Sequence, residues 1–135
     1  MYNREELVNL AKEARSRAYS PYSNFCVGAA LLCDNGQIYT GANVENSSYG
    51  GAICAERVAF CTAVHNGEKS FKAIAIIGAK RGEEIKAFCA PCGICRQFMS
   101  EFCGADFEIL LYDGENIKVK TMAEMLPESF DSSML

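Results

Sequence analysis

One short segment, FCAPCGICRQF at residues 88–98, holds three cysteines at every third position: Cys89, Cys92 and Cys95. This spacing is compatible with a disulfide, an iron–sulfur cluster or a zinc site. Cys92 and Cys95 form a P-C-x-x-C pair at an expected helix start, where backbone amides and the helix dipole favour thiolates. Tetrahedral zinc commonly uses such a pair together with ligands from elsewhere in the chain.

Cys54, in the tripeptide Cys54-Ala55-Glu56, also stands at an expected helix start and is the candidate third ligand. Three protein ligands leave the fourth position of zinc for water, which is the arrangement of catalytic zinc sites. Glu56 would lie close to the metal without binding it, so it could take a proton from that water and return it elsewhere. The combination C-x-E…P-C-x-x-C matches the zinc deaminase signature in its three-cysteine form.

Arg57 directly follows this candidate proton carrier. Zinc bound by three thiolates carries a net negative charge, which weakens its pull on water unless a nearby positive group compensates. The Arg57 guanidinium could donate hydrogen bonds to thiolate sulfurs, and the two helix N-termini would act in the same direction. We therefore expect Arg57 to support the metal site without binding the metal.

Three other interpretations use some of the same residues. An iron–sulfur run would continue with a fourth cysteine followed by proline, but position 99 is Met99 and Pro91 lies inside the run. A purely structural zinc module would need a fourth ligand, which Cys89 could provide. A nucleic-acid-editing deaminase would share the zinc site, but the formal net charge of −4 argues against a broad basic surface for a strand.

Length and composition indicate a single globular domain over residues 1–135. Half of the residues are hydrophobic and 22% are charged, which is typical of a folded domain. We see no secretory signal and no apolar run of membrane-spanning length. The eight cysteines therefore point to a reducing, cytoplasmic location, where metal binding or catalysis is the usual role of clustered thiols.

The order of helices and strands predicts how these side chains are brought together. Helices are expected over residues 3–18, 54–65, 93–102 and a short segment from Thr121 to Pro127. Strands are expected over residues 27–33, 37–43, 71–79, 107–112 and 116–120. This order favours an α/β fold with a mixed five-stranded sheet between two layers of helices, a three-layer α-β-α arrangement.

Nearly the whole chain resembles cytidine deaminases of the small, free-nucleoside type. The matching segments, in order, are SPYSNFCVGAAL, GANVENSSYG, ICAERVA, PCGICRQ and LPESF. The resemblance implies one zinc per subunit and hydrolysis of cytidine and 2′-deoxycytidine to uridine and 2′-deoxyuridine, with release of ammonia, in pyrimidine salvage. It also implies a homotetramer with shared active sites, in which Tyr49 and Phe130 reach a neighbouring subunit's pocket. The acidic charge and the lack of a long apolar run predict neither nucleic-acid nor membrane partners.

The same resemblance assigns the residues that would bind the nucleoside. Asn43 and Glu45, in NVEN, are expected to hydrogen-bond the ribose hydroxyls, which can donate to a carboxylate and accept from an amide. Phe25 is expected to pack on the pyrimidine ring. The backbone N–H and C=O groups around Ala55 are expected to recognise the edge of the base.

The remaining cysteines are expected to be structural. Small buried hydrophobes are the ordinary role of a free cysteine in a strand or on a helix. We expect this role for Cys26, Cys33, Cys61, Cys89 and Cys103.

Overall fold

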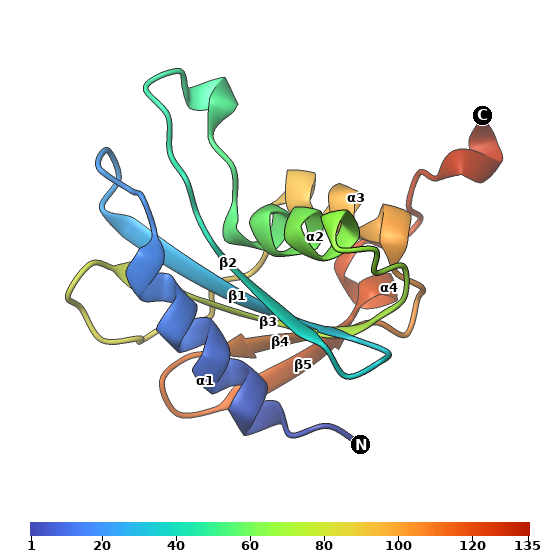
Figure 1. Cartoon of the computed structure of the whole chain (residues 1–135), viewed down its shortest axis with the longest axis horizontal. Coiled ribbons are helices and arrows are strands. Elements are labelled where there is room, and N and C mark those ends of the chain that lie inside the picture. Colours follow the sequence, from blue (N-terminus) through green and yellow to red (C-terminus); the bar gives the residue numbers. More distant parts are fainter.

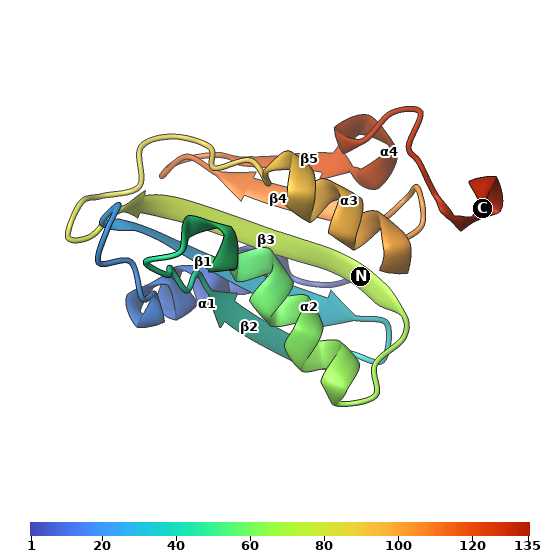
Figure 2. The same ribbon diagram turned by 90° about the horizontal axis from the view of Figure 1, so that it is seen from above.

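The structure, a computed structural model, describes residues 1–135 and contains one sheet with helices on both faces (Figures 1 and 2). Helix α1 lies on one face, and α2 and α3 lie side by side on the other. The helices are α1 (Arg4–Ala14), α2 (Ala55–His65), α3 (Gly93–Phe102) and α4 (Met122–Met125). The strands are β1 (Phe25–Cys33), β2 (Ile38–Ala42), β3 (Phe71–Lys80), β4 (Glu108–Tyr112) and β5 (Ile117–Thr121).

The sheet is mixed, as the sequence predicts. Its strand order is β2-β1-β3-β4-β5. Strand β1 pairs antiparallel with both β2 and β3, β3 pairs parallel with β4, and β4 pairs antiparallel with β5. The parallel pair requires a crossover, and α3 provides it.

Alternation along β3 explains the three layers. Ile74 and Ile76 belong to the core beneath α2 and α3, whereas Ala73, Ala75 and Ile77 belong to the core beneath α1. Successive strand side chains point to opposite faces, so a continuously apolar strand is buried on both sides. The expected three-layer α-β-α arrangement is therefore confirmed.

Helix α1 is shorter than predicted. Asn3 caps it, since its side chain accepts from the Glu6 amide at 3.1 Å. The α-helix ends at Ala14, however, and a 3-10 turn (Arg15–Arg17) follows. The apolar spacing extends to Ala18 because that residue is buried with Cys26 and Ala42 in a separate small cluster. Ala18 therefore marks burial rather than continuation of the helix.

The helices that carry the candidate site begin close to where the sequence predicts. Helix α3 has the predicted bounds, and α2 starts one residue later because Cys54 is its N-cap. The Thr121–Glu124 capping box before α4 is also present. None of the helices combines the length and the apolar character needed to cross a membrane.

Candidate metal and catalytic site

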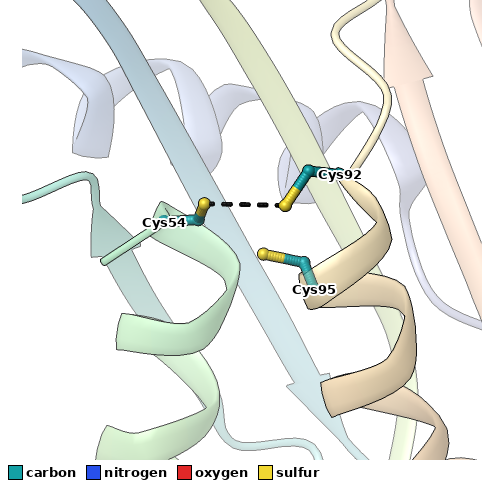
Figure 3. A group of neighbouring side chains, drawn as sticks. All are labelled: Cys54, Cys92 and Cys95. Atoms are coloured by element: carbon teal, nitrogen blue, oxygen red, sulfur yellow. Dashed lines mark hydrogen bonds between the residues drawn. The ribbon is translucent and has the colours of Figure 1, made fainter. Parts of the chain in front are cut away.

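The N-terminal ends of α2 and α3 lie next to each other and bring three cysteines together (Figure 3). Cys54 is the N-cap of α2, Cys92 is the N-cap of α3, and Cys95 lies in the first turn of α3. Arg96 fixes the segment before Cys92, because its Nε donates to the Pro91 carbonyl at 2.8 Å. The three sulfurs thus converge from two helix starts that are 38 residues apart in the chain.

The separation of the sulfurs fits tetrahedral zinc. The three Sγ atoms lie within 4.8 Å of one another, and Cys54 Sγ is 3.9 Å from Cys92 Sγ. Zn–S bonds of about 2.3 Å at a tetrahedral angle place two sulfurs about 3.8 Å apart. Three thiolates are also donors that zinc prefers. The cluster of Cys54, Cys92 and Cys95 is therefore able to hold a zinc ion.

The surroundings of Cys54 favour its thiolate. A hydrogen bond from Cys95 lowers the pKa of Cys54 to about 5 and raises the pKa of Cys95. Arg57 acts in the same direction on Cys54, since its Nη2 donates to Cys54 Sγ at 3.7 Å. This contact with the thiolate also raises the pKa of Arg57. A positive group thus already faces the cluster from the side of α2.

Glu56 is a buried carboxyl beside the cluster, with only 4% of its surface exposed. Burial raises its pKa to about 7, and the neighbouring Cys54 thiolate adds to this effect. Hydrogen bonds from the backbone of Glu56 and from Cys95 act in the opposite direction. A cation held by the thiolates would also favour the charged carboxylate. Glu56 is therefore a carboxyl that is itself shielded from bulk water, beside a cluster in which Cys92 is exposed.

Asn43 and Glu45 are held by backbone groups of nearby segments. The Asn43 side chain accepts from the Val27 amide at 2.8 Å and donates to the Phe25 carbonyl at 2.9 Å. The side-chain oxygen of Asn43 can accept one more hydrogen bond, and its side-chain nitrogen can donate one more. Asn43 thus fastens the end of β2 to the start of β1, where Phe25 lies.

Glu45 accepts hydrogen bonds from the Tyr22 amide at 3.0 Å, the Ser23 amide at 3.1 Å and the Ser23 hydroxyl. The Ser23 hydroxyl is the main cause of the lowered pKa of Glu45. A cavity of about 270 Å³ adjoins it, lined by Tyr22, Ser23, Glu45, Asn46, Tyr49 and Ala52. Tyr22 and Ser23 are not predicted as functional residues from the sequence, because backbone donors leave no side-chain signal.

The aromatic residues assigned by resemblance are accessible in the single chain. Phe25 is 37% exposed, Tyr49 is 78% exposed and Phe130 is 54% exposed. Tyr49 lies near the Tyr22 ring, with 6.2 Å between the centroids. The C-terminal tail that carries Phe130 extends away from the sheet (Figure 1). Contact of Tyr49 and Phe130 with a neighbouring subunit stays a prediction.

All eight cysteines are free. Cys26 and Cys33 are buried, as predicted. The prediction for Cys61 is wrong, because this residue is exposed on α2. Its neighbour Phe60 occupies the buried face instead, and adjacent helical positions point in different directions.

Cys89 lies near the site but is not one of the three clustered thiols. Its sulfur and the Phe25 ring fill the space beside Gly78, where an added Cβ would be 2.8 Å from Cys89 Sγ and 2.9 Å from the ring. Burial raises the pKa of Cys89 to about 11. A neutral thiol packed in this way behaves as a small hydrophobe. Cys103 is similar, since burial raises its pKa to about 12.

Three clustered thiols at paired helix starts, with a buried carboxyl two residues after the first, form the arrangement of zinc deaminases. Residues 1–110 match the family described as the cytidine and deoxycytidylate deaminase zinc-binding region, and the chain belongs to the cytidine deaminase family.

Relatives of known name and structure agree with this assignment. A cytidine deaminase of Sporosarcina psychrophila is 44% identical over 132 residues, which cover 97% of this chain and 93% of that protein. One from Halalkalibacterium halodurans is 43% identical over 129 residues, covering 95% and 94% of the two chains. The crystal structure of cytidine deaminase from Burkholderia pseudomallei has a TM-score of 0.86 and 41% identity, covering 96% of this chain and 100% of that one.

Proposed function

We propose that this protein is a zinc-dependent enzyme that hydrolyses free cytidine and 2′-deoxycytidine to uridine and 2′-deoxyuridine, releasing ammonia, in pyrimidine salvage. One observation carries the proposal: Glu56 is buried beside a cluster of three cysteines at two helix N-termini. A carboxyl in this position has a proton-transfer role to perform that a purely structural zinc module would not need. Family membership supports cytosine as the reacting base.

Cys54, Cys92 and Cys95 are the proposed ligands of one zinc per chain. When bound there, zinc would act as a Lewis acid that lowers the pKa of a bound water from its value in bulk solvent toward about 7. The amides at the two helix starts and the Arg57 guanidinium offset the negative charge of three thiolates. The chain thereby keeps its metal site electrophilic despite the sulfur ligands.

Glu56 is the proposed general base and then general acid. It takes a proton from the attacking water and delivers it to N3 of the pyrimidine, which makes C4 more electrophilic. After the oxygen adds at C4, Glu56 takes the proton of the new C4 hydroxyl and transfers it to the amine. The C4–N bond then breaks, the C4 carbonyl forms, and the amine leaves as ammonia. The low exposure of Glu56 keeps bulk water from competing for these protons.

The remaining proposed roles concern binding of the nucleoside. Glu45 would accept from a ribose hydroxyl, and the free amide positions of Asn43 would complete this contact. Phe25 would pack against the pyrimidine ring, and the backbone around Ala55 would recognise its edge. The hydrogen bonds that already hold Asn43 and Glu45 support this proposal, because prearranged groups lose less entropy on binding.

Arg57→Ala is expected to lower both zinc affinity and kcat, each by about tenfold. The substitution removes the hydrogen bond to Cys54 Sγ and the positive charge beside the thiolates. Competition with a chelator of known affinity measures the first effect, and turnover of zinc-saturated protein measures the second. If both quantities matched those of the unaltered protein, Arg57 would have no supporting role.

We further propose a cytoplasmic homotetramer in which residues 1–135 form one domain. Eight free cysteines suit a reducing compartment. Exposed Tyr49 and Phe130 are large enough to complete the pocket of a neighbouring chain, as the family resemblance suggests. A solution mass equal to that of one chain would contradict this assembly.

Free cytidine is expected to react far faster than cytosine within single-stranded DNA or RNA. The net charge of −4 disfavours phosphate backbones, and the residues proposed to bind ribose suit a nucleoside with free hydroxyl groups. A competition assay with equal concentrations of cytosine in the two forms measures the ratio of kcat/KM values. Preference for the oligonucleotide would instead indicate a nucleic-acid-editing enzyme, and bound zinc without turnover of any cytosine compound would indicate a structural module.

A further inference from the structure

Arg81, the first residue after β3, contacts both ends of the segment formed by residues 18–24. Its Nη2 donates to the Ala18 carbonyl at 3.0 Å and to Ser20 Oγ at 3.2 Å. Its backbone amide donates to the Asn24 carbonyl at 2.8 Å. A single residue of a distant strand end therefore fixes the beginning and the end of this segment.

The opposite side of the same segment contacts the residues proposed to bind ribose. The Tyr19 amide donates to the Asn43 carbonyl at 2.9 Å, and the Glu45 amide donates to the Tyr19 carbonyl at 2.8 Å. The amides of Tyr22 and Ser23 donate to the Glu45 carboxylate. Any shift of the segment would therefore shift the groups that hold Glu45.

The segment ends in a turn and packs against neighbouring residues. Asn24 has a φ of 60°, in the left-handed region, which asparagine adopts more readily than most other non-glycine residues. Ser20 is only 2% exposed, and its Oγ lies 3.2 Å from Cys26 Sγ as well as within reach of Arg81. Phe25 follows directly at the start of β1. The segment thus leads straight into the residue proposed to pack on the base.

Arg81 has no carboxylate partner. The one ion pair in the structure joins Arg4 and Glu108, and the acceptors of the Arg81 side chain are a carbonyl and a hydroxyl. Hydrogen bonds from a charged donor are stronger than those between neutral groups. The guanidinium therefore holds backbone geometry rather than balancing charge.

We propose that Arg81 is a positioning residue for nucleoside binding, which keeps residues 18–24 in the arrangement that presents Glu45 and Phe25 to the substrate. It touches neither the substrate nor the metal. This inference rests on the proposed nucleoside specificity. Because the cysteine cluster and Glu56 are carried by α2 and α3, loss of Arg81 affects binding and leaves the chemical step intact.

Arg81→Gln is expected to raise KM for cytidine about tenfold, with kcat within about twofold of the original and zinc content unchanged. The dissociation constant of cytidine, measured by calorimetry with Glu56→Gln added to both proteins to suppress turnover, should rise by the same factor. Lys80→Gln is the matched control, because it removes the positive charge of the preceding residue. Lys80 accepts a hydrogen bond from Arg15 through its backbone carbonyl, which the substitution leaves in place. Its KM should stay at the original value. Arg81→Lys keeps the positive charge but lacks the planar guanidinium group that donates to two acceptors at once, so we expect a KM between those of the original protein and Arg81→Gln.

Three results would overturn the inference: an unchanged KM in Arg81→Gln, a loss of kcat without a rise in KM, or an equal rise in KM in Lys80→Gln. If Arg81→Gln fails to fold, Ser20→Ala removes one of the same hydrogen bonds, and it should raise KM about threefold with zinc retained. An unchanged KM in that variant would overturn the inference too. Absence of cytidine turnover by the unaltered protein would instead contradict the proposed function, and calorimetry would still test Arg81 through cytidine binding.

Discussion

Glu56→Gln is expected to retain one zinc per chain and to lower kcat for cytidine by a factor of about 10²–10⁴. Glutamine keeps the shape of the side chain but cannot take a proton from water or return it to N3. Because the residue is buried beside the cluster and not part of it, the metal ligands stay in place. Steady-state kinetics together with zinc analysis of the same preparation measures both quantities.

The matched control is Glu101→Gln, the same chemical change on the exposed surface of α3. This variant should keep full turnover, because Glu101 forms no side-chain hydrogen bond or ion pair. Near-normal kcat in Glu56→Gln would contradict the proposed role of Glu56 as the general base. Loss of zinc in that variant would instead assign Glu56 to the metal ligands.

Cys92→Ala is expected to lose bound zinc and, with it, all turnover above background. Removing one of three thiolates leaves two protein ligands. Structural zinc in zinc-finger peptides, where all four ligands are present, is bound with about 10–16 kcal/mol. The Cys54 and Cys92 sulfurs are 3.9 Å apart, a separation that fits two ligands of one zinc ion, so this substitution removes one of its proposed ligands. Zinc content per chain after dialysis against a weak chelator measures the loss.

Cys89→Ala tests the alternative ligand and is the natural control. Its sulfur packs beside Gly78 and Phe25 and lies outside the cluster, so this variant should retain zinc. A loss of zinc from Cys89→Ala equal to that from Cys92→Ala would support a closed four-cysteine site. Such a site would have no open position for water and would favour a structural module.

The sequence is sufficient to predict the metal cluster because the ligands lie in short, recognisable motifs. Cys54, Cys92 and Cys95 each stand at a helix start that local signals also predict, so proximity needed only the packing of α2 next to α3. The mixed sheet follows from element order and from the apolar run of β3, which is buried on both faces. These features depend on local patterns and on general rules for α/β folds.

Other features depend on contacts that no local pattern records. The amides of Tyr22 and Ser23 hold Glu45, and any residue type other than proline could supply such donors. Arg81 reaches Ala18 and Ser20 across more than 60 residues of chain. Cysteine is a residue type that is often buried, yet Cys61 lies on the solvent-facing side of α2. Long-range contacts and helix phase were therefore visible only in the folded chain.

Zinc titration of the metal-free protein, followed by turnover of free cytidine, tests the central claim most directly. Conversion to uridine is followed by the change in near-ultraviolet absorbance, and bound zinc is measured in the same samples. We expect no turnover without metal and a linear rise in rate that stops at one zinc per chain. Full activity in the metal-free protein, or stoichiometric zinc without deamination of cytidine, would contradict it.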